Sequence, residues 1–167
     1  MEAANENYTI YTIGHGNRKT DDFIYLLKRY EIELLVDVRT YPYSRFHTQF
    51  RQAALESSLD AADINYLFLG EELGGRPKDP VLYTNGRVDY TAVKQTQLFK
   101  SGIEQVEDLA KKGVRLALMC SEADQNHCHR KHMLTGEFIR DGFEVLHINK
   151  SGSLESEAKD ETLGLFL

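Results

Sequence analysis

Short apolar runs that alternate with helical patterns constrain this chain more than any other feature of its sequence. The runs are rich in β-branched, leucine and aromatic residues, and they lie at 8–13, 34–39, 64–69, 114–120 and 144–148. Helical spacing of apolar residues fills the segments at about 20–30, 52–63, 91–111 and 130–140. This alternation predicts a single-domain α/β fold, a three-layer sandwich whose mainly parallel, Rossmann-like sheet has about five strands.

The chain divides into an N-terminal extension at 1–7, an α/β domain at 8–148 and a C-terminal tail at 149–167. Many glycine and proline residues at 70–90 predict a long loop or lid. The helical pattern at 91–111 is expected to break near Ser101 and Gly102. The polar tail ends in an apolar segment, 163–167, which we expect to dock on the domain or on the second subunit of a homodimer.

Charge and hydropathy exclude several classes of protein. A formal net charge of −6 argues against uniform attraction to nucleic acid or to an anionic membrane, so any phosphate binding must be local. No apolar run approaches the roughly twenty residues that cross a bilayer, and residues 1–7 lack a secretory signal pattern. The spacing of Cys120 and Cys128 suits a site better than a disulfide framework. We therefore expect a cytoplasmic protein with no membrane partner.

Charged and reactive side chains follow the predicted strands. His15 comes after the first strand, and Asp37 and Arg39 end the second. Cys120 and Glu122 end the fourth. Because the carboxyl ends of parallel strands meet at one edge of the sheet, where ligands bind, we expect these side chains to line one pocket.

A second group of residues is expected to bind an anion. Cys128, His129 and Arg130 stand where a helix is expected to begin, so its free N–H groups would favour an anion or a thiolate. Arg130 has the forked geometry that clamps phosphate or carboxylate. Four residues are therefore expected to join Arg130 at the anion: Arg39, Ser44, Arg45 and His129.

The candidate catalytic residues have simpler alternative roles. Glu122 is the candidate general acid or base, since burial among charged groups would move its pKa towards neutrality; otherwise it pairs with an arginine. Cys120 and Cys128 are candidate nucleophiles, or else a core residue and a helix cap. His15 is a candidate proton donor, or else a hydrogen-bonded turn residue.

Asp37 is expected to support the site, and it also allows a purely structural explanation. Asp37 and Arg39 lie on one face of their strand and would form an internal ion pair that holds the strand end. Arg39, Arg45 and Arg130 would repel one another in a single pocket without an anion. Their predicted proximity therefore favours a phosphate-bearing ligand. Five aromatic residues flank the pocket and either pack or stack on a base: Tyr41, Tyr43, Phe46, Phe50 and Tyr83.

Metal and cofactor patterns are incomplete in this sequence. Cys120, His127, Cys128 and His129 are ligand types that zinc prefers, but paired C-x-x-C or H-E-x-x-H spacing is absent. The turn that contains His15 lacks the third glycine of a dinucleotide fingerprint. We predict no bound metal and no cofactor.

Six short motifs resemble, in order along the chain, those of the domain-of-unknown-function 488 (DUF488) family. The resemblance spans about 8–148 and implies an α/β fold with a site, and it carries no established reaction. The motifs are Tyr11-Thr-Ile-Gly-His15, Leu35-Val-Asp-Val-Arg39 with Pro42 and Ser44-Arg45, Leu73-Gly-Gly75, Met119-Cys-Ser-Glu122, Cys128-His-Arg130 and Val145-Leu-His-Ile148.

Our leading hypothesis from the sequence is an enzyme that acts by hydrolysis or group transfer on a phosphate-bearing substrate. The substrate would be a small molecule, a nucleotide or a nucleic-acid component. The first alternative is a non-catalytic module that binds a nucleotide or a nucleic-acid end. The second is a metal-dependent enzyme that uses the Cys/His cluster. Substrate identity, reaction class and oligomeric state stay open at this point.

Overall fold

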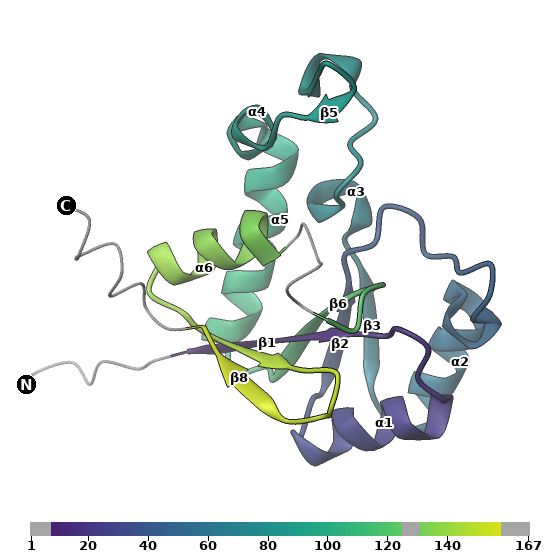
Figure 1. The fold of residues 1–167 in the computed structure, drawn as a ribbon. Helices are drawn as coiled ribbons and strands as arrows, with labels where there is room; N and C mark the ends of the chain where they lie inside the picture. Colours follow the sequence, from purple (N-terminus) through teal and green to yellow (C-terminus); the bar gives the residue numbers. More distant parts are fainter. Residues whose placement is uncertain (1–7, 125–130, 158–167) are drawn as a thin grey trace, which may run out of the picture.

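The structure, a computed structural model, describes residues 8–124 and 131–157. In this part of the chain six strands form one sheet in the order β3-β2-β6-β1-β7-β8. All pairs are parallel except β7 with β8. The predicted α/β fold is confirmed (Figure 1). The strands are β1 (Thr9–Gly14), β2 (Leu34–Asp37), β3 (Asn65–Phe68), β6 (Leu116–Cys120), β7 (Glu144–Ile148) and β8 (Leu154–Ser156).

Helices cover both faces of the sheet. On one face lie α1 (Thr20–Arg29) and α2 (Gln52–Ala61), which pack Phe23 and Leu55 against the sheet. On the other lie α5 (Gln97–Lys111), the π-helical turn η4 (Lys131–Thr135) and α6 (Gly136–Arg140), with Val106 and Phe138 in the core. Every residue of β2 is buried, as expected of a strand between two helical layers. Each described helix is too short or too polar to cross a bilayer.

Residues 70–90 hold more regular structure than the predicted loop. They contain α3 (Gly70–Leu73), the 3-10 turn η2 (Pro80–Leu82) and a hairpin of β4 (Tyr83–Thr84) and β5 (Arg87–Val88). A further 3-10 turn, η1 (Thr48–Phe50), precedes α2. These pieces are too short to give a periodic sequence pattern.

The predicted helix break near Ser101 and Gly102 is wrong. Helix α4 (Tyr90–Gln95) ends before Thr96, and the hydroxyl of Thr96 accepts a hydrogen bond from the Phe99 N–H at 3.2 Å. This bond caps α5, because it satisfies one of the free N–H groups at the helix start. Gly102 instead lies within α5, where the absence of a Cβ lets the helix approach α3.

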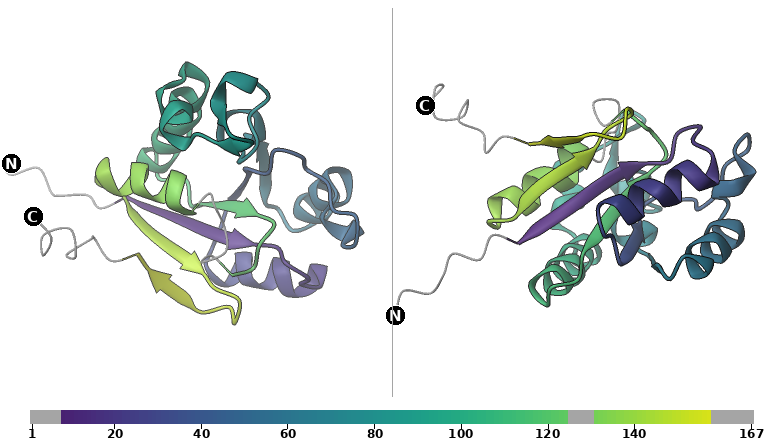
Figure 2. Two further views of the ribbon diagram at one scale, coloured as in Figure 1. Left: turned by 45° about the horizontal axis from the view of Figure 1, so that its top comes forward. Right: turned by 90° about the horizontal axis from the view of Figure 1, so that it is seen from below.

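The sixth strand, β8, lies in the tail and was not predicted. It pairs antiparallel with β7 and extends the sheet by one edge strand (Figure 2). All three of its residues are exposed, so it lacks the apolar alternation by which strands are recognised in a sequence.

The connections that follow the neighbouring parallel strands β1 and β6 run on opposite faces of the sheet. The loop after β1 leads to α1 on one face, whereas the segment after β6 leads to α6 on the other. Neighbouring parallel strands with such connections form a topological switch point, where α/β proteins bind ligands. Two backbone hydrogen bonds join the described parts of these loops, from His15 N–H to the Cys120 carbonyl at 3.0 Å and from Gly16 N–H to the Ser121 carbonyl at 2.9 Å.

The close approach of these two loops gives a first prediction. A Cβ at Gly14 would overlap the backbone carbonyl of Glu122, so Gly14→Ala must displace one loop and should lower the free energy of unfolding by about 2 kcal/mol or more. A Cβ at Gly136, in α6, meets open space, and Gly136→Ala should stabilise the protein by roughly 0.5 kcal/mol or more. Urea unfolding of both variants checks this prediction, and equal effects would contradict it.

Candidate active site

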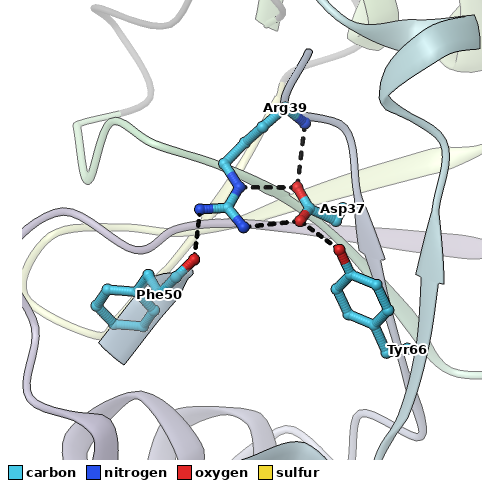
Figure 3. Close-up of polar contacts among 4 residues, drawn as sticks. All are labelled: Asp37, Arg39, Phe50 and Tyr66. Carbon is cyan, nitrogen blue, oxygen red and sulfur yellow. Dashed lines mark hydrogen bonds and ion pairs between the residues drawn. The ribbon is translucent and has the colours of Figure 1, made fainter. Parts of the chain in front are cut away.

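A buried ion pair between Asp37 and Arg39 forms the base of the candidate site. The Arg39 Nε and Nη2 atoms donate to the two carboxylate oxygens of Asp37 at 2.9 and 2.8 Å (Figure 3). The side chains are 2% and 0% exposed. The Asp37 carboxylate also accepts from the backbone N–H of Arg39 at 3.1 Å. The internal ion pair that the sequence allowed is therefore present, and Arg39 faces Asp37 in this conformation.

Two aromatic residues complete this network. Tyr66, in β3, donates its hydroxyl proton to Asp37 at 2.7 Å, and Arg39 Nη1 donates to the backbone carbonyl of Phe50 at 2.7 Å. Burial raises the pKa of Tyr66, and its hydrogen bond to Asp37 raises it further, so the hydroxyl remains a donor at neutral pH. The network ties the ends of β2 and β3 to the 3-10 turn before α2.

His15 lies next to this network and is almost completely buried. Its ring stacks on Phe50 with centroids 4.4 Å apart, and Nδ1 lies 2.8 Å from the carbonyl oxygen of Gly16. Because a carbonyl only accepts, Nδ1 carries the proton and Nε2 presents a lone pair. Nε2 is buried and has no hydrogen-bond partner among the described residues.

The protonation state of His15 follows from its position. Burial lowers its pKa to about 4; the Gly16 hydrogen bond opposes this shift and the charge of Arg39 adds to it. The imidazole is therefore neutral at physiological pH. A neutral ring with a buried, unpaired Nε2 can accept a proton, attack an electrophile or ligate a metal.

Cys120 and Glu122 lie at the end of β6, as predicted, but in different surroundings. Cys120 is half-buried, and its Sγ donates to the backbone carbonyl of Glu122 at 3.4 Å. The side chain of Glu122 is exposed, so the burial that we expected around it is absent. Both residues line a cavity of about 40 Å³ with Thr12, Thr135 and His147. This volume suits a water molecule or a small ion, and a nucleotide is too large for it.

The remaining predicted residues fall into two groups. Ser44 and Arg45 lie in the segment after β2, where the Ser44 hydroxyl accepts from the backbone N–H of His47 at 3.1 Å and the side chain of Arg45 is exposed. Four predicted residues lie outside the described part of the chain: His127, Cys128, His129 and Arg130. Among the residues that are described, no group of three or more His, Cys, Asp and Glu side chains could hold a metal ion.

The structure thus brings His15, Asp37 and Arg39 together from two strand ends. It adds Tyr66 and gives Phe50 a specific role, and sequence analysis found neither. Tyr66 lies within an apolar run and pairs in register with Leu35. Only the alignment of β2 with β3 shows that its hydroxyl reaches Asp37.

Comparison with known families decides where this chain belongs. The sequence model of one family, described as "Domain of unknown function DUF488", matches residues 19–135. The chain belongs to the DUF488 family. The matched part of this DUF488 protein includes the Asp37–Arg39 pair and the end of β6, whereas His15 lies before it. Searches of curated proteins and of solved structures found no match to the chain.

Removal of one partner of the Asp37–Arg39 pair should destabilise this DUF488 protein strongly. Asp37→Asn leaves Arg39 buried without a counter-charge, which should lower the free energy of unfolding by about 3 kcal/mol or more. The exposed pair of Lys78 and Glu71, 3.8 Å apart, is the control, and Lys78→Ala should change stability by less than about 1 kcal/mol. Urea unfolding at pH 7 measures both. Similar losses in the two variants would contradict the prediction.

The lowered pKa of His15 predicts a dependence of stability on pH. The unfolded chain binds a proton at His15 below about pH 6.5, whereas the folded protein binds it only below about pH 4. His15 therefore makes its full contribution to stability above pH 6.5 and loses it as pH falls towards 4. From pH 7 to 4.5 the wild type should lose about 2 kcal/mol more than His15→Gln. Urea unfolding at both pH values tests this, and equal losses would contradict a buried neutral His15.

Proposed function

We propose that this DUF488 protein is an enzyme that acts on a phosphate-bearing substrate by hydrolysis or group transfer, at the carboxyl edge of β1, β2 and β6. One observation carries the proposal: the neutral, buried His15 at the topological switch point, whose Nε2 atom has no hydrogen-bond partner within residues 8–124 and 131–157. A buried polar atom without a partner lowers stability by about 1–3 kcal/mol. Such an atom in a native protein is a candidate for function.

His15 is suited to accept a proton in this reaction. In hydrolysis, Nε2 would take a proton from the attacking water while the new oxygen–phosphorus bond forms and the bond to the leaving oxygen breaks. Glu122, exposed at the neighbouring strand end, would accept a hydrogen bond from the attacking water and orient it, and the proton held by Nε2 would then pass to the leaving oxygen. The Nδ1 hydrogen bond to Gly16 and the stacking on Phe50 hold the ring in one orientation. Cys120 is the alternative nucleophile: His15 would take the thiol proton, the sulfur would form a bond to phosphorus as the bond to the leaving oxygen breaks, and an acceptor oxygen would then displace the sulfur.

Arg39 is not the cation that would bind the phosphate. Asp37 neutralises Arg39, which therefore shapes the site and tunes His15. Arg45 is exposed, and Arg130 belongs to the Cys128-His-Arg130 motif of the sequence. We assign the phosphate to these two guanidinium groups. Ser44 and His129 would be further donors.

Phosphate release from a panel of nucleotides and nitrophenyl phosphate esters tests the proposal. We expect turnover of at least one member, and His15→Gln should lower kcat by roughly a hundredfold or more. Glu122→Gln should also lower kcat while sparing nucleotide affinity. Lys112→Ala, which removes an exposed cation at the end of α5, is the control and should leave turnover unchanged. Wild-type turnover that His15→Gln retains would refute the role of His15. Nucleotide binding without turnover of any panel member would favour the non-catalytic binding module. The exposed rings of Tyr41, Tyr43 and Phe46 also support that second candidate.

A further inference from the structure

We infer that the segment 40–51, here called the aromatic loop, binds single-stranded nucleic acid. The inference rests on the proposed function for the reaction at phosphate. It deepens that function by naming a nucleic-acid strand as the substrate class. The aromatic loop connects the end of β2 to α2 (Figure 1). Its exposed side chains include the two kinds that bind such strands, aromatic rings and a guanidinium group.

The charge of the aromatic loop differs from that of the whole chain. Residues 38–55 contain three arginines, Arg39, Arg45 and Arg51, and no aspartate or glutamate, although the chain carries a net charge of −6. Arg39 is neutralised internally by Asp37, so Arg45 and Arg51 make the loop locally positive. A positive segment on an acidic protein favours a polyanionic partner at this place and disfavours general adsorption.

The aromatic rings of the loop are open to solvent. Tyr41, Tyr43 and Phe46 are 65%, 57% and 81% exposed. Covering these rings would remove their apolar surface from water, which favours binding. Stacked bases would cover them, and any base stacks, because every base has a π face.

Two arginines lie against two of these rings, Tyr43 and Phe46. The Arg51 guanidinium lies 4.5 Å from the centroid of Tyr43, donates to the Tyr43 hydroxyl at 3.0 Å and donates to the Ser44 carbonyl at 3.1 Å. The Arg45 guanidinium lies 5.3 Å from the centroid of Phe46. Rings that are already positioned lose less conformational entropy on binding, and each lies beside a cation that can meet a phosphate.

A groove continues the surface from Tyr41. It has a volume of about 510 Å³, within the size range of small-molecule sites, and Phe68, Phe99 and Arg76 contribute to its walls. The backbone N–H of Arg76 donates to the Thr40 hydroxyl at 3.0 Å, which fixes this wall to the aromatic loop. Three carboxylates also line the groove, those of Glu71, Glu72 and Asp79. Glu71 pairs with Lys78, and Asp79 accepts a hydrogen bond from the backbone N–H of Val81.

The other end of the aromatic loop lies at the candidate active site. Phe50 stacks on His15, and the Gln49 amide donates to the backbone carbonyl of Arg18, just after His15, at 3.0 Å. A strand that follows the loop from the groove towards α2 would therefore bring one of its phosphates to the proposed reaction site. A nucleotide monomer would occupy only part of this surface.

Fluorescence anisotropy with a short labelled oligothymidylate tests the inference on the full chain. The wild type should bind it and prefer it to a duplex of equal length. Phe46→Ala should weaken affinity by roughly fivefold or more. Arg45→Ala should weaken affinity and reduce the slope of log Kd against log salt by about 0.7. The matched controls lie on α1: Tyr25, an exposed ring, and Arg29, which lies 5.3 Å from the centroid of Tyr30. Tyr25→Ala and Arg29→Ala should leave affinity unchanged.

The outcomes separate this inference from the proposed function. His15→Gln should keep oligothymidylate affinity even where it abolishes turnover. Turnover of the substrate panel without oligothymidylate binding would overturn the nucleic-acid surface and leave the enzyme intact. Loop variants that match their controls, or a preference for duplex, would also overturn it. Two further results would overturn the nucleic-acid surface. One is binding of the wild type to anionic lipid vesicles and not to oligothymidylate, and the other is self-association of the wild type that Phe46→Ala abolishes.

Discussion

The buried ion pair of Asp37 and Arg39 is the interaction on which the site depends. Two charges can remain in a dry interior only if each has a complete set of partners, because a lone buried charge costs several kcal/mol. Here the partners come from β2, β3 and the turn before α2. The same hydrogen bonds that satisfy Arg39 therefore fix Phe50, and Phe50 fixes the ring of His15.

A second constraint is the close contact of the loops after β1 and β6. Gly14 has no side chain where the Glu122 carbonyl approaches, and Gly16 adopts a positive φ of 51°, which glycine tolerates best. His15 lies beside this contact and is buried, and burial makes its imidazole neutral. Burial keeps the ring unprotonated and its contacts fix its orientation, and neither property follows from the residue type alone.

The sequence predicted the five parallel strands because each is an apolar run with a turn signal behind it. It missed β8, whose exposed residues carry no such pattern, and it placed the break before α5 five or six residues late. Ser101 and Gly102 are weak helix formers, but tertiary packing against α3 decided their conformation. For the site, strand ends placed His15, Asp37 and Arg39 near one another, while the single pocket that would also hold Cys120 and Glu122 stays a prediction. Glu122, expected to be buried, is exposed, since burial depends on neighbours that the local sequence does not specify.

The amino-acid sequence by itself determined the α/β fold, the edge of the sheet at which polar residues gather, and the membership of the DUF488 family, because each of these follows from local patterns and short motifs. Tertiary structure decided which of the gathered groups are neutralised and which remain available. Arg39 is matched by Asp37, whereas Nε2 of His15 has no partner in the described part of the chain and the aromatic loop keeps exposed rings. The reason is physical: hydrogen bonding and burial are properties of residues distant in sequence, and only the folded chain brings those residues into contact.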